Sequence, residues 1–156
     1  MRIVATCLAF FLIVASSIAQ AACRDDQAEL RGPWGQARFT VEIADTEALR
    51  AQGLMHRERL ARSAGMLFIY DAPTSPSFWM RNTLIPLDMI FVDERGLVTR
   101  VHKNARPLDE TPISGGENVL MVLEINGGLS AMLGVAEGSE LRHPRLAQDT
   151  ALWPCD

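Results

Sequence analysis

Alternating and continuous apolar positions predict a series of short strands along this chain. Phe39, Val41 and Ile43 alternate with polar residues, which is the pattern of a half-buried strand. Apolar runs of strand length follow at 66–70, 87–92 and 119–125. Further short strands are predicted at 77–80, 97–102 and 139–142. Short strands at regular spacing with few helices are typical of a β-sandwich or barrel.

Two short helices are predicted between these strands. Asp45 stands at an N-cap position, Leu49 is expected to face inward, and Gly53 ends the first helix. Residues 129–133 are expected to make one or two further turns. Residues 103–117 contain two prolines and a Gly-Gly pair and are predicted to form a loop. The pattern therefore predicts one all-β domain, sandwich or barrel-like, with two short helices.

The first 22 residues have the layout of a secretory signal. A cationic start precedes an apolar run and then small residues, with Ala19-Gln20-Ala21 as a cleavage motif. A transmembrane helix needs about 20 apolar residues, and this run is shorter. We expect cleavage near Ala21 or Ala22, which leaves about 134 residues, the length of one domain. The sequence thus predicts an exported protein, periplasmic or secreted, with no stable membrane insertion after cleavage.

The net charge of the chain excludes one class of function. The full chain has a formal charge of −4, and removing the signal with Arg2 makes it one charge more negative. This balance excludes a polybasic protein that binds nucleic acid or a membrane surface. The mature chain is expected to comprise a lead-in segment at 23–37, a β domain at 38–143 and a C-terminal tail at 144–156.

Cys23 and Cys155 stand at the two ends of the mature chain. An oxidising compartment favours a disulfide between them, and closing so long a loop stabilises by roughly 5 kcal/mol in the chain-entropy model. Two alternatives are a lipidated Cys23 and a pair of idle thiols. The Gln20 that precedes Cys23 is unlike the aliphatic residue of an acylation signal. We therefore favour the disulfide.

Recognisable catalytic and metal motifs are missing from the sequence. It contains no Gly-rich phosphate loop, no G-x-S-x-G and no H-E-x-x-H, and its three histidines are scattered. Methionines with Met55-His56 and Trp79-Met80 could supply soft ligands to Cu(I). Methionine serves equally as adaptable core filler, which is the favoured interpretation. We expect no metal and no cofactor.

The densest chemistry lies in residues 78–88. On a strand, Phe78 and Met80 would face the core while Trp79 and Arg81 face the other way, close to a turn at Asn82. An indole ring beside guanidinium and amide groups is a plausible platform for a small ligand. The alternative is that Trp79 is buried in the core and Arg81 pairs with a carboxylate.

Asp88 and Glu124 are carboxylates inside otherwise apolar strands. A buried carboxylate is costly without a partner, so each should be paired or hydrogen-bonded. The two could be the acid and base of a glycosidase-like hydrolase. The favoured alternative is structural: Asp88 supports the Asn82 turn or pairs with Arg57 or Arg81, while Glu124 lies on a solvated face.

These stretches resemble the bacterial and archaeal family called domain of unknown function 192. The matching pieces are Gly53-Leu54-Met55 with Arg57, Gly65-Met66-Leu67-Phe68, Phe78-Trp79-Met80 with Asn82-Thr83, Pro86-Leu87-Asp88, the 93–96 turn, Ala105 with Pro107, and Val122-Leu123-Glu124. The resemblance spans about residues 38–143. It implies a β-rich, sandwich-like fold and no particular reaction.

Together these observations favour an exported binding or accessory module with a small-ligand cleft near Trp79. The candidate ligand-binding residues are Arg57, Trp79, Arg81, Asn82, Asp88 and His102. The alternatives are a hydrolase that uses Asp88 and Glu124 and a purely structural or interaction module. The sequence identifies neither the ligand nor the oligomeric state.

Overall fold

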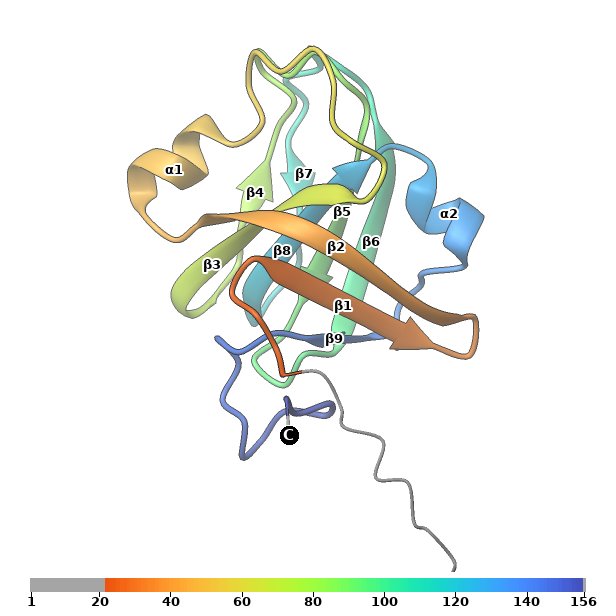
Figure 1. Ribbon diagram of the computed structural model, residues 1–156. Coiled ribbons are helices and arrows are strands. Elements are labelled where there is room, and N and C mark those ends of the chain that lie inside the picture. Colours follow the sequence, from red (N-terminus) through yellow and green to blue (C-terminus); the bar gives the residue numbers. More distant parts are fainter. Residues whose placement is uncertain (1–21, 156) are drawn as a thin grey trace, which may run out of the picture.

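The computed structural model describes residues 22–155 and consists mostly of strands (Figure 1). Its elements, in chain order, are β1 (Gln27–Gly32), β2 (Gly35–Ala44), α1 (Glu47–Gln52), β3 (Ala64–Thr74), β4 (Ser77–Phe78), β5 (Leu87–Val92), β6 (Val98–Ala105), β7 (Ile113–Ser114), β8 (Val119–Asn126), α2 (Leu129–Leu133) and β9 (Glu140–Arg142). The prediction of one mainly β domain with two short helices is confirmed.

A curled seven-stranded sheet forms the body of the domain. Its strand order is β6-β5-β8-β3-β2-β1-β9, and only β2 and β3 run parallel. The two edges meet at one end, where Leu97 bridges Glu140 and the Gly138 N–H donates to the Val98 carbonyl over 2.9 Å. The sheet is therefore barrel-like. β4 and β7 form a separate two-stranded ribbon.

The sheet buries apolar side chains on both of its faces. Leu67, Ile90 and Leu123 belong to a core cluster on one face, whereas Phe68 and Phe91 belong to a second cluster on the other. This second cluster also takes in residues of the β4–β7 ribbon and of the segment after α1. Burial on both faces explains why β5 is buried along its whole length. Four methionines are core filler, as favoured from the sequence: Met66, Met80, Met89 and Met121.

Two strands occupy segments that the sequence analysis assigned otherwise. β1 lies in the predicted lead-in segment, where it pairs antiparallel with β2 through a turn at Pro33-Trp34. β7 lies within the predicted 103–117 loop and pairs with β4. Both escaped prediction because β1 buries only Ala28 and Leu30 within a polar segment, and β7 is only two residues long.

Helix α1 differs from its prediction at two residues. Thr46, not Asp45, is the N-cap, and its hydroxyl accepts a hydrogen bond from the Leu49 N–H over 3.2 Å. Leu49 is 43% exposed, so the expectation that it faces inward is wrong. The physical reason is that α1 lies at the rim of the molecule and buries none of its residues.

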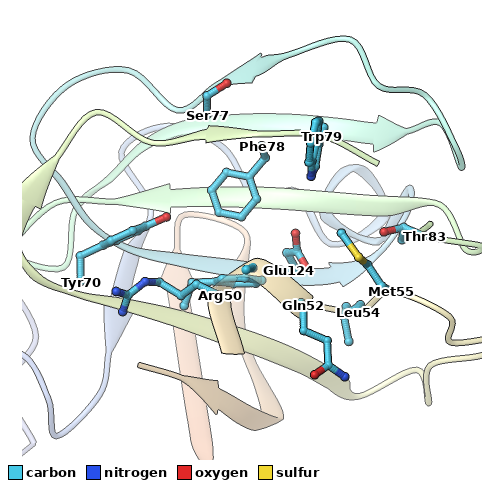
Figure 2. Close-up of a pocket in the computed structure, with 13 residues that line it drawn as sticks. Arg50, Gln52, Leu54, Met55, Tyr70, Ser77, Phe78, Trp79, Thr83 and Glu124 are labelled. Carbon is cyan, nitrogen blue, oxygen red and sulfur yellow. The ribbon is translucent and has the colours of Figure 1, made fainter. Parts of the chain in front are cut away.

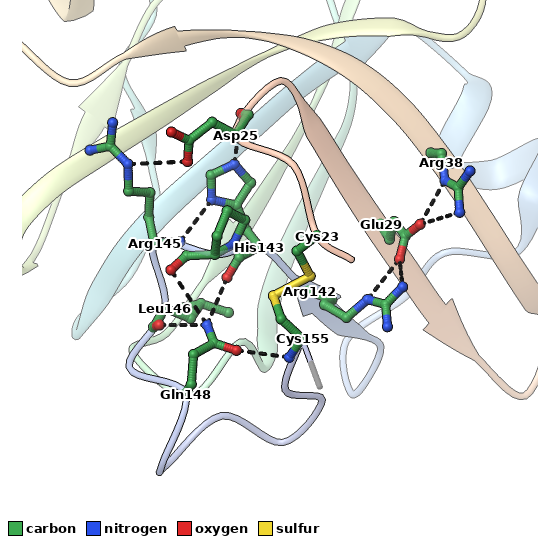
Figure 3. Close-up of a disulfide and its surroundings, with 11 residues drawn as sticks. Cys23, Asp25, Glu29, Arg38, Arg142, His143, Arg145, Leu146, Gln148 and Cys155 are labelled. Atoms are coloured by element: carbon green, nitrogen blue, oxygen red, sulfur yellow. Dashed lines mark hydrogen bonds and ion pairs between the residues drawn. A yellow bond between two sulfur atoms is a disulfide. The ribbon is translucent and has the colours of Figure 1, made fainter. Parts of the chain in front are cut away.

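A disulfide joins Cys23 to Cys155, with their Cα atoms 5.4 Å apart, and confirms the predicted pairing (Figure 3). The segment after β9 packs on the domain through Leu146 and Trp153, both buried. The guanidinium of Arg142 lies 4.5 Å from the centre of the Trp153 ring. The C-terminal segment is therefore held by packing as well as by the covalent bond.

Burial lowers the pKa of His143, which lies close to the disulfide in Figure 3. Its Nδ1 accepts a hydrogen bond from the Arg145 N–H over 3.2 Å, so its Nε2 donates to the Asp25 carbonyl over 3.0 Å. The neutral imidazole thus links the two ends of the described chain.

The predicted signal and its cleavage site lie in residues 1–22, nearly all outside the described residues. Within residues 22–155, no helix is long and apolar enough to cross a membrane.

Candidate functional site

A cleft of about 290 Å³ lies between the α1 segment and β4, above β3 and β8 (Figure 2). Its lining combines aromatic, thioether and polar side chains. They come from Arg50, Ala51, Gln52, Gly53, Leu54, Met55, Phe68, Tyr70, Ser77, Phe78, Trp79, Thr83 and Glu124. The volume suits a small organic molecule.

Glu124 lies at the centre of the cleft in Figure 2, with Trp79 on one side and α1 on the other. On β8 it stands opposite Met66 of β3 and Met89 of β5, so its side chain emerges on the face of the second core cluster. Only 4% of the residue is exposed, and burial raises its pKa to about 8. Among the described residues, none donates a hydrogen bond to its carboxyl group.

The expectation that Glu124 lies on a solvated face is therefore wrong. The reason is tertiary: α1 and β4 cover the part of the sheet from which its side chain emerges. A carboxyl group with a pKa near 8 holds its proton at neutral pH, and it can both donate and accept hydrogen bonds. It can also exchange a proton with a bound molecule in the physiological pH range.

Trp79 forms the exposed aromatic wall of the cleft. The residue is 46% exposed, while its neighbour Met80 is buried in the core. Phe78 packs edge-on against Phe68, with ring centres 5.2 Å apart. The guanidinium of Arg81 lies 5.4 Å from the centre of the Trp79 ring. The predicted division of this segment between core and exposed face is confirmed, and the alternative of a core Trp79 is wrong.

Tyr70 and Arg50 extend the cleft wall, and the sequence analysis did not select either. Arg50 donates to the carbonyls of Asp45 and Ile69, each over 2.8 Å, and its guanidinium stacks 5.0 Å from the centre of the Tyr70 ring. Burial raises the pKa of the Tyr70 hydroxyl. The strand pattern could have identified Tyr70. It follows Phe68 by two residues on β3, so its side chain lies on the same face of the sheet as Glu124 of the paired strand β8.

Arg57 and Asn82 lie beside the cleft and do not line it. Arg57 makes a bidentate pair with Glu42, with both nitrogen–oxygen distances 2.6 Å, so it does not pair with Asp88. Asn82 has a φ of 55° and its carbonyl accepts from the His56 N–H over 2.8 Å. Its side-chain nitrogen lies 4.0 Å from the sulfur of Met55, a cleft residue.

Asp88 is fully buried and bonded only to backbone. Its carboxylate accepts from the N–H groups of Asn104 at 2.6 Å, Gly128 at 2.9 Å and Ser130 at 2.7 Å. It therefore supports the turn into α2, and the expected roles at the Asn82 turn or with an arginine are wrong. The physical reason is register, because Asp88 pairs with Ile125 and faces the opposite side of the sheet from Glu124.

This geometry also overturns the two-carboxylate hydrolase. An acid and a base must flank one scissile bond, whereas the side chains of Asp88 and Glu124 lie on opposite faces of one sheet.

Replacing Asp88 tests its structural role. In Asp88→Asn the amide keeps one acceptor oxygen and places a donor against a backbone N–H, so we expect a loss of about 2–3 kcal/mol of unfolding free energy. Urea denaturation monitored by tryptophan fluorescence measures this loss. The matched control Asp149→Asn changes an exposed carboxylate and should leave the midpoint unchanged. Equal stability of the two variants would contradict the assignment.

His102 lines a different cavity, described below, together with residues of β6 and β7. Of the six predicted ligand-binding residues, only Trp79 lines the cleft; Arg81 lies against its ring, and Arg57 and Asn82 lie beside the cleft. The structure places Asp88 on the opposite face of the sheet and His102 at a different cavity. Among the residues that the structure describes, no three His, Cys, Asp or Glu side chains form a group that could hold a metal ion.

Comparison with known sequences identifies the family. The sequence model of DUF192, described as an uncharacterised ACR family, matches residues 30–143, most of the chain. The chain belongs to the DUF192 family. The match begins at Leu30, within β1, and includes every residue that lines the cleft. A search of the curated proteins finds no match.

Two solved structures resemble this DUF192 chain. One is a protein of unknown function from Novosphingobium aromaticivorans, 44% identical, with a TM-score of 0.73 over 74% of this chain and 82% of that one. The other, from Sinorhizobium meliloti, is described as a candidate transcription regulator. It is 36% identical, with a TM-score of 0.73 over 79% of this chain and 96% of that one. Both support the fold described here.

Proposed function

We propose that this DUF192 domain binds a small organic ligand in the cleft between α1 and β4. In this proposal the body of the ligand lies against Trp79, and a polar group of the ligand hydrogen-bonds to Glu124. The domain acts as a binding or accessory module, exported through its N-terminal segment. The Cys23–Cys155 disulfide supports an oxidising compartment, because such bonds persist there and are rare in the cytosol.

The observation that carries this proposal is the carboxyl group of Glu124. Buried polar groups in proteins are nearly always hydrogen-bonded, and a carboxyl group without a partner destabilises the fold. Glu124 has no protein donor among the described residues, yet it is buried at the floor of an open cleft. A ligand that donates a hydrogen bond there would satisfy it.

The walls of the cleft indicate the shape of the ligand. Trp79 offers an exposed ring face, and Phe78 and Met55 add apolar surface beside it. Ser77 places an exposed hydroxyl at the rim, where it can orient a polar substituent, while Thr83 is buried in the lining and its hydroxyl donates to the Arg81 carbonyl over 3.4 Å. The site therefore suits a compact molecule with one flat or apolar face and at least one donor group, such as an amine or a hydroxyl.

A ligand panel of amines, polyols and aromatic acids, followed by thermal shift, tests the proposal. A ligand at a hundred times its dissociation constant should stabilise the wild type by about 2.7 kcal/mol. Trp79→Ala should weaken binding about tenfold or more, because stacking on this ring is lost. Met132→Ala, which shortens an exposed apolar side chain on α2, is the matched control and should bind normally.

Glu124→Gln then separates two kinds of ligand. Glutamine mimics the protonated carboxyl group, so neutral donors should bind this variant nearly as well as the wild type, whereas amines should bind it at least tenfold more weakly. A flat panel, or full binding of every hit by Trp79→Ala, would overturn the proposal.

A further inference from the structure

A second cavity, of about 410 Å³, lies between β6 and β7, and nothing in the proposed function uses it. Its lining is rich in cationic and hydroxyl groups, unlike the aromatic cleft. It is formed by Met80, Arg100, His102, Asn104, Ala105, Arg106, Asp109, Thr111, Pro112, Ile113 and Ser114. The two cavities share no lining residue.

The geometry of β6 delivers the cationic groups to this cavity. Arg100 stands opposite Phe91 and His102 opposite Met89, so both side chains lie on the face of the second core cluster. The register then shifts, and Asn104 takes a φ of 53° with its N–H bonded to Asp88. This irregularity redirects the chain after β6 and brings Arg106 to the same cavity.

The two guanidinium groups at this cavity are not held in salt bridges within the described residues. Hydrogen bonds from Thr111 and, to a smaller extent, the charge of Arg106 lower the pKa of Asp109, so Arg106 has one carboxylate in its surroundings. Neither Arg100 nor Arg106 forms an ion pair within residues 22–155, whereas Arg31, Arg57 and Arg142 each do. Asp109 is the only acidic residue of the lining, and its carboxylate accepts from the Thr111 N–H over 2.9 Å. Arg100 also borders a shallower hollow that contains Glu117 and Glu137, without pairing with either.

We propose that this cavity binds the oxyanion group of a small molecule, a phosphate or a carboxylate. Guanidinium groups present paired donors that match the oxygens of both anions. Arg100 and Arg106 would supply the charge, His102 a further donor, and the hydroxyls of Thr111 and Ser114 neutral hydrogen bonds. The proposal stands on residues separate from those of the aromatic cleft, so either can fail alone.

Isothermal titration at low and constant ionic strength tests the site, with inorganic phosphate and citrate as separate probes. We expect saturable binding of at least one probe by the wild type, and the stronger one identifies the kind of oxyanion. Arg100→Ala and Arg106→Ala should each weaken that binding about tenfold or more, the loss expected for one charge-assisted hydrogen-bonding group. Arg59→Ala removes the same charge from an exposed position outside the cavity and should bind normally.

Two results would overturn this site. One is the absence of saturable binding of phosphate and citrate by the wild type at millimolar concentrations. The other is an equal loss in Arg59→Ala, which would show a response to net charge rather than to the cavity. Circular dichroism of each variant establishes that it is folded. His102→Gln is a third lining variant, which keeps both arginines and should also weaken binding of the probe.

Discussion

Glu124→Gln is expected to match the wild type in stability below about pH 4.5 and to become increasingly more stable than it as the pH rises from there to about 8. In the folded protein the pKa of this carboxyl is about 8, against an ordinary value of 4.5. Between these values the folded state holds a proton that the unfolded state has released. The contribution of this carboxyl group to the unfolding free energy is therefore fully present below pH 4.5, and it falls by about 1.4 kcal/mol per pH unit as the pH rises toward 8.

Urea denaturation at a series of pH values measures this slope. The control is Glu58→Gln, which neutralises an exposed carboxylate and should follow the wild-type profile. A slope shared by both variants would contradict the assignment to Glu124. Because a ligand cation in the cleft would favour the ionised form, a bound amine should also reduce the wild-type slope.

Loss of the Cys23–Cys155 disulfide is expected to lower the unfolding free energy by up to about 5 kcal/mol. The two cysteines are 132 residues apart in sequence, and the chain-entropy model assigns roughly this value to a loop of that size. The measurement is urea denaturation of the wild type with and without a thiol reductant, compared with the Cys23→Ser/Cys155→Ser variant.

The double variant should match the reduced wild type and should not respond to reductant. Packing of Trp153 against the guanidinium groups of Arg31 and Arg142 remains after reduction, so the C-terminal segment should stay docked on the folded domain. A loss below about 1 kcal/mol would show that these contacts, rather than the covalent bond, hold the two ends.

Much of the sheet could be predicted from the sequence because its central strands are long and apolar. β5 and β8 are buried almost throughout, and hydrophobicity alone marks such segments. β1 and β7 could not be found this way, since short or polar strands depend on the partners beside them. The N-cap at Thr46 was missed by one residue because Asp45 has an equally suitable side chain.

The candidate site was only partly predictable for a related reason. Trp79 stood out because strand alternation turns its side chain away from the face on which its core neighbour Met80 lies. The surroundings of Glu124 depend on the segments that cross above it, and no local pattern contains that information. Asp88 was recognised as a carboxylate in need of partners, but its backbone donors come from residues 16 to 42 positions away.

The parallel pairing of β2 and β3 has a consequence for how this family can diversify. A parallel pair requires a crossover, and here residues 45–63 make it while also forming one wall of the aromatic cleft. Helix α1 within that crossover buries no residue of its own. Changes within α1 should therefore leave the barrel-like body unchanged, whereas Leu54 in the same crossover is part of the second core cluster and cannot be replaced freely. If the proposed ligand binding is correct, α1 is the part of the crossover where substitutions should change the cleft at the least cost in stability.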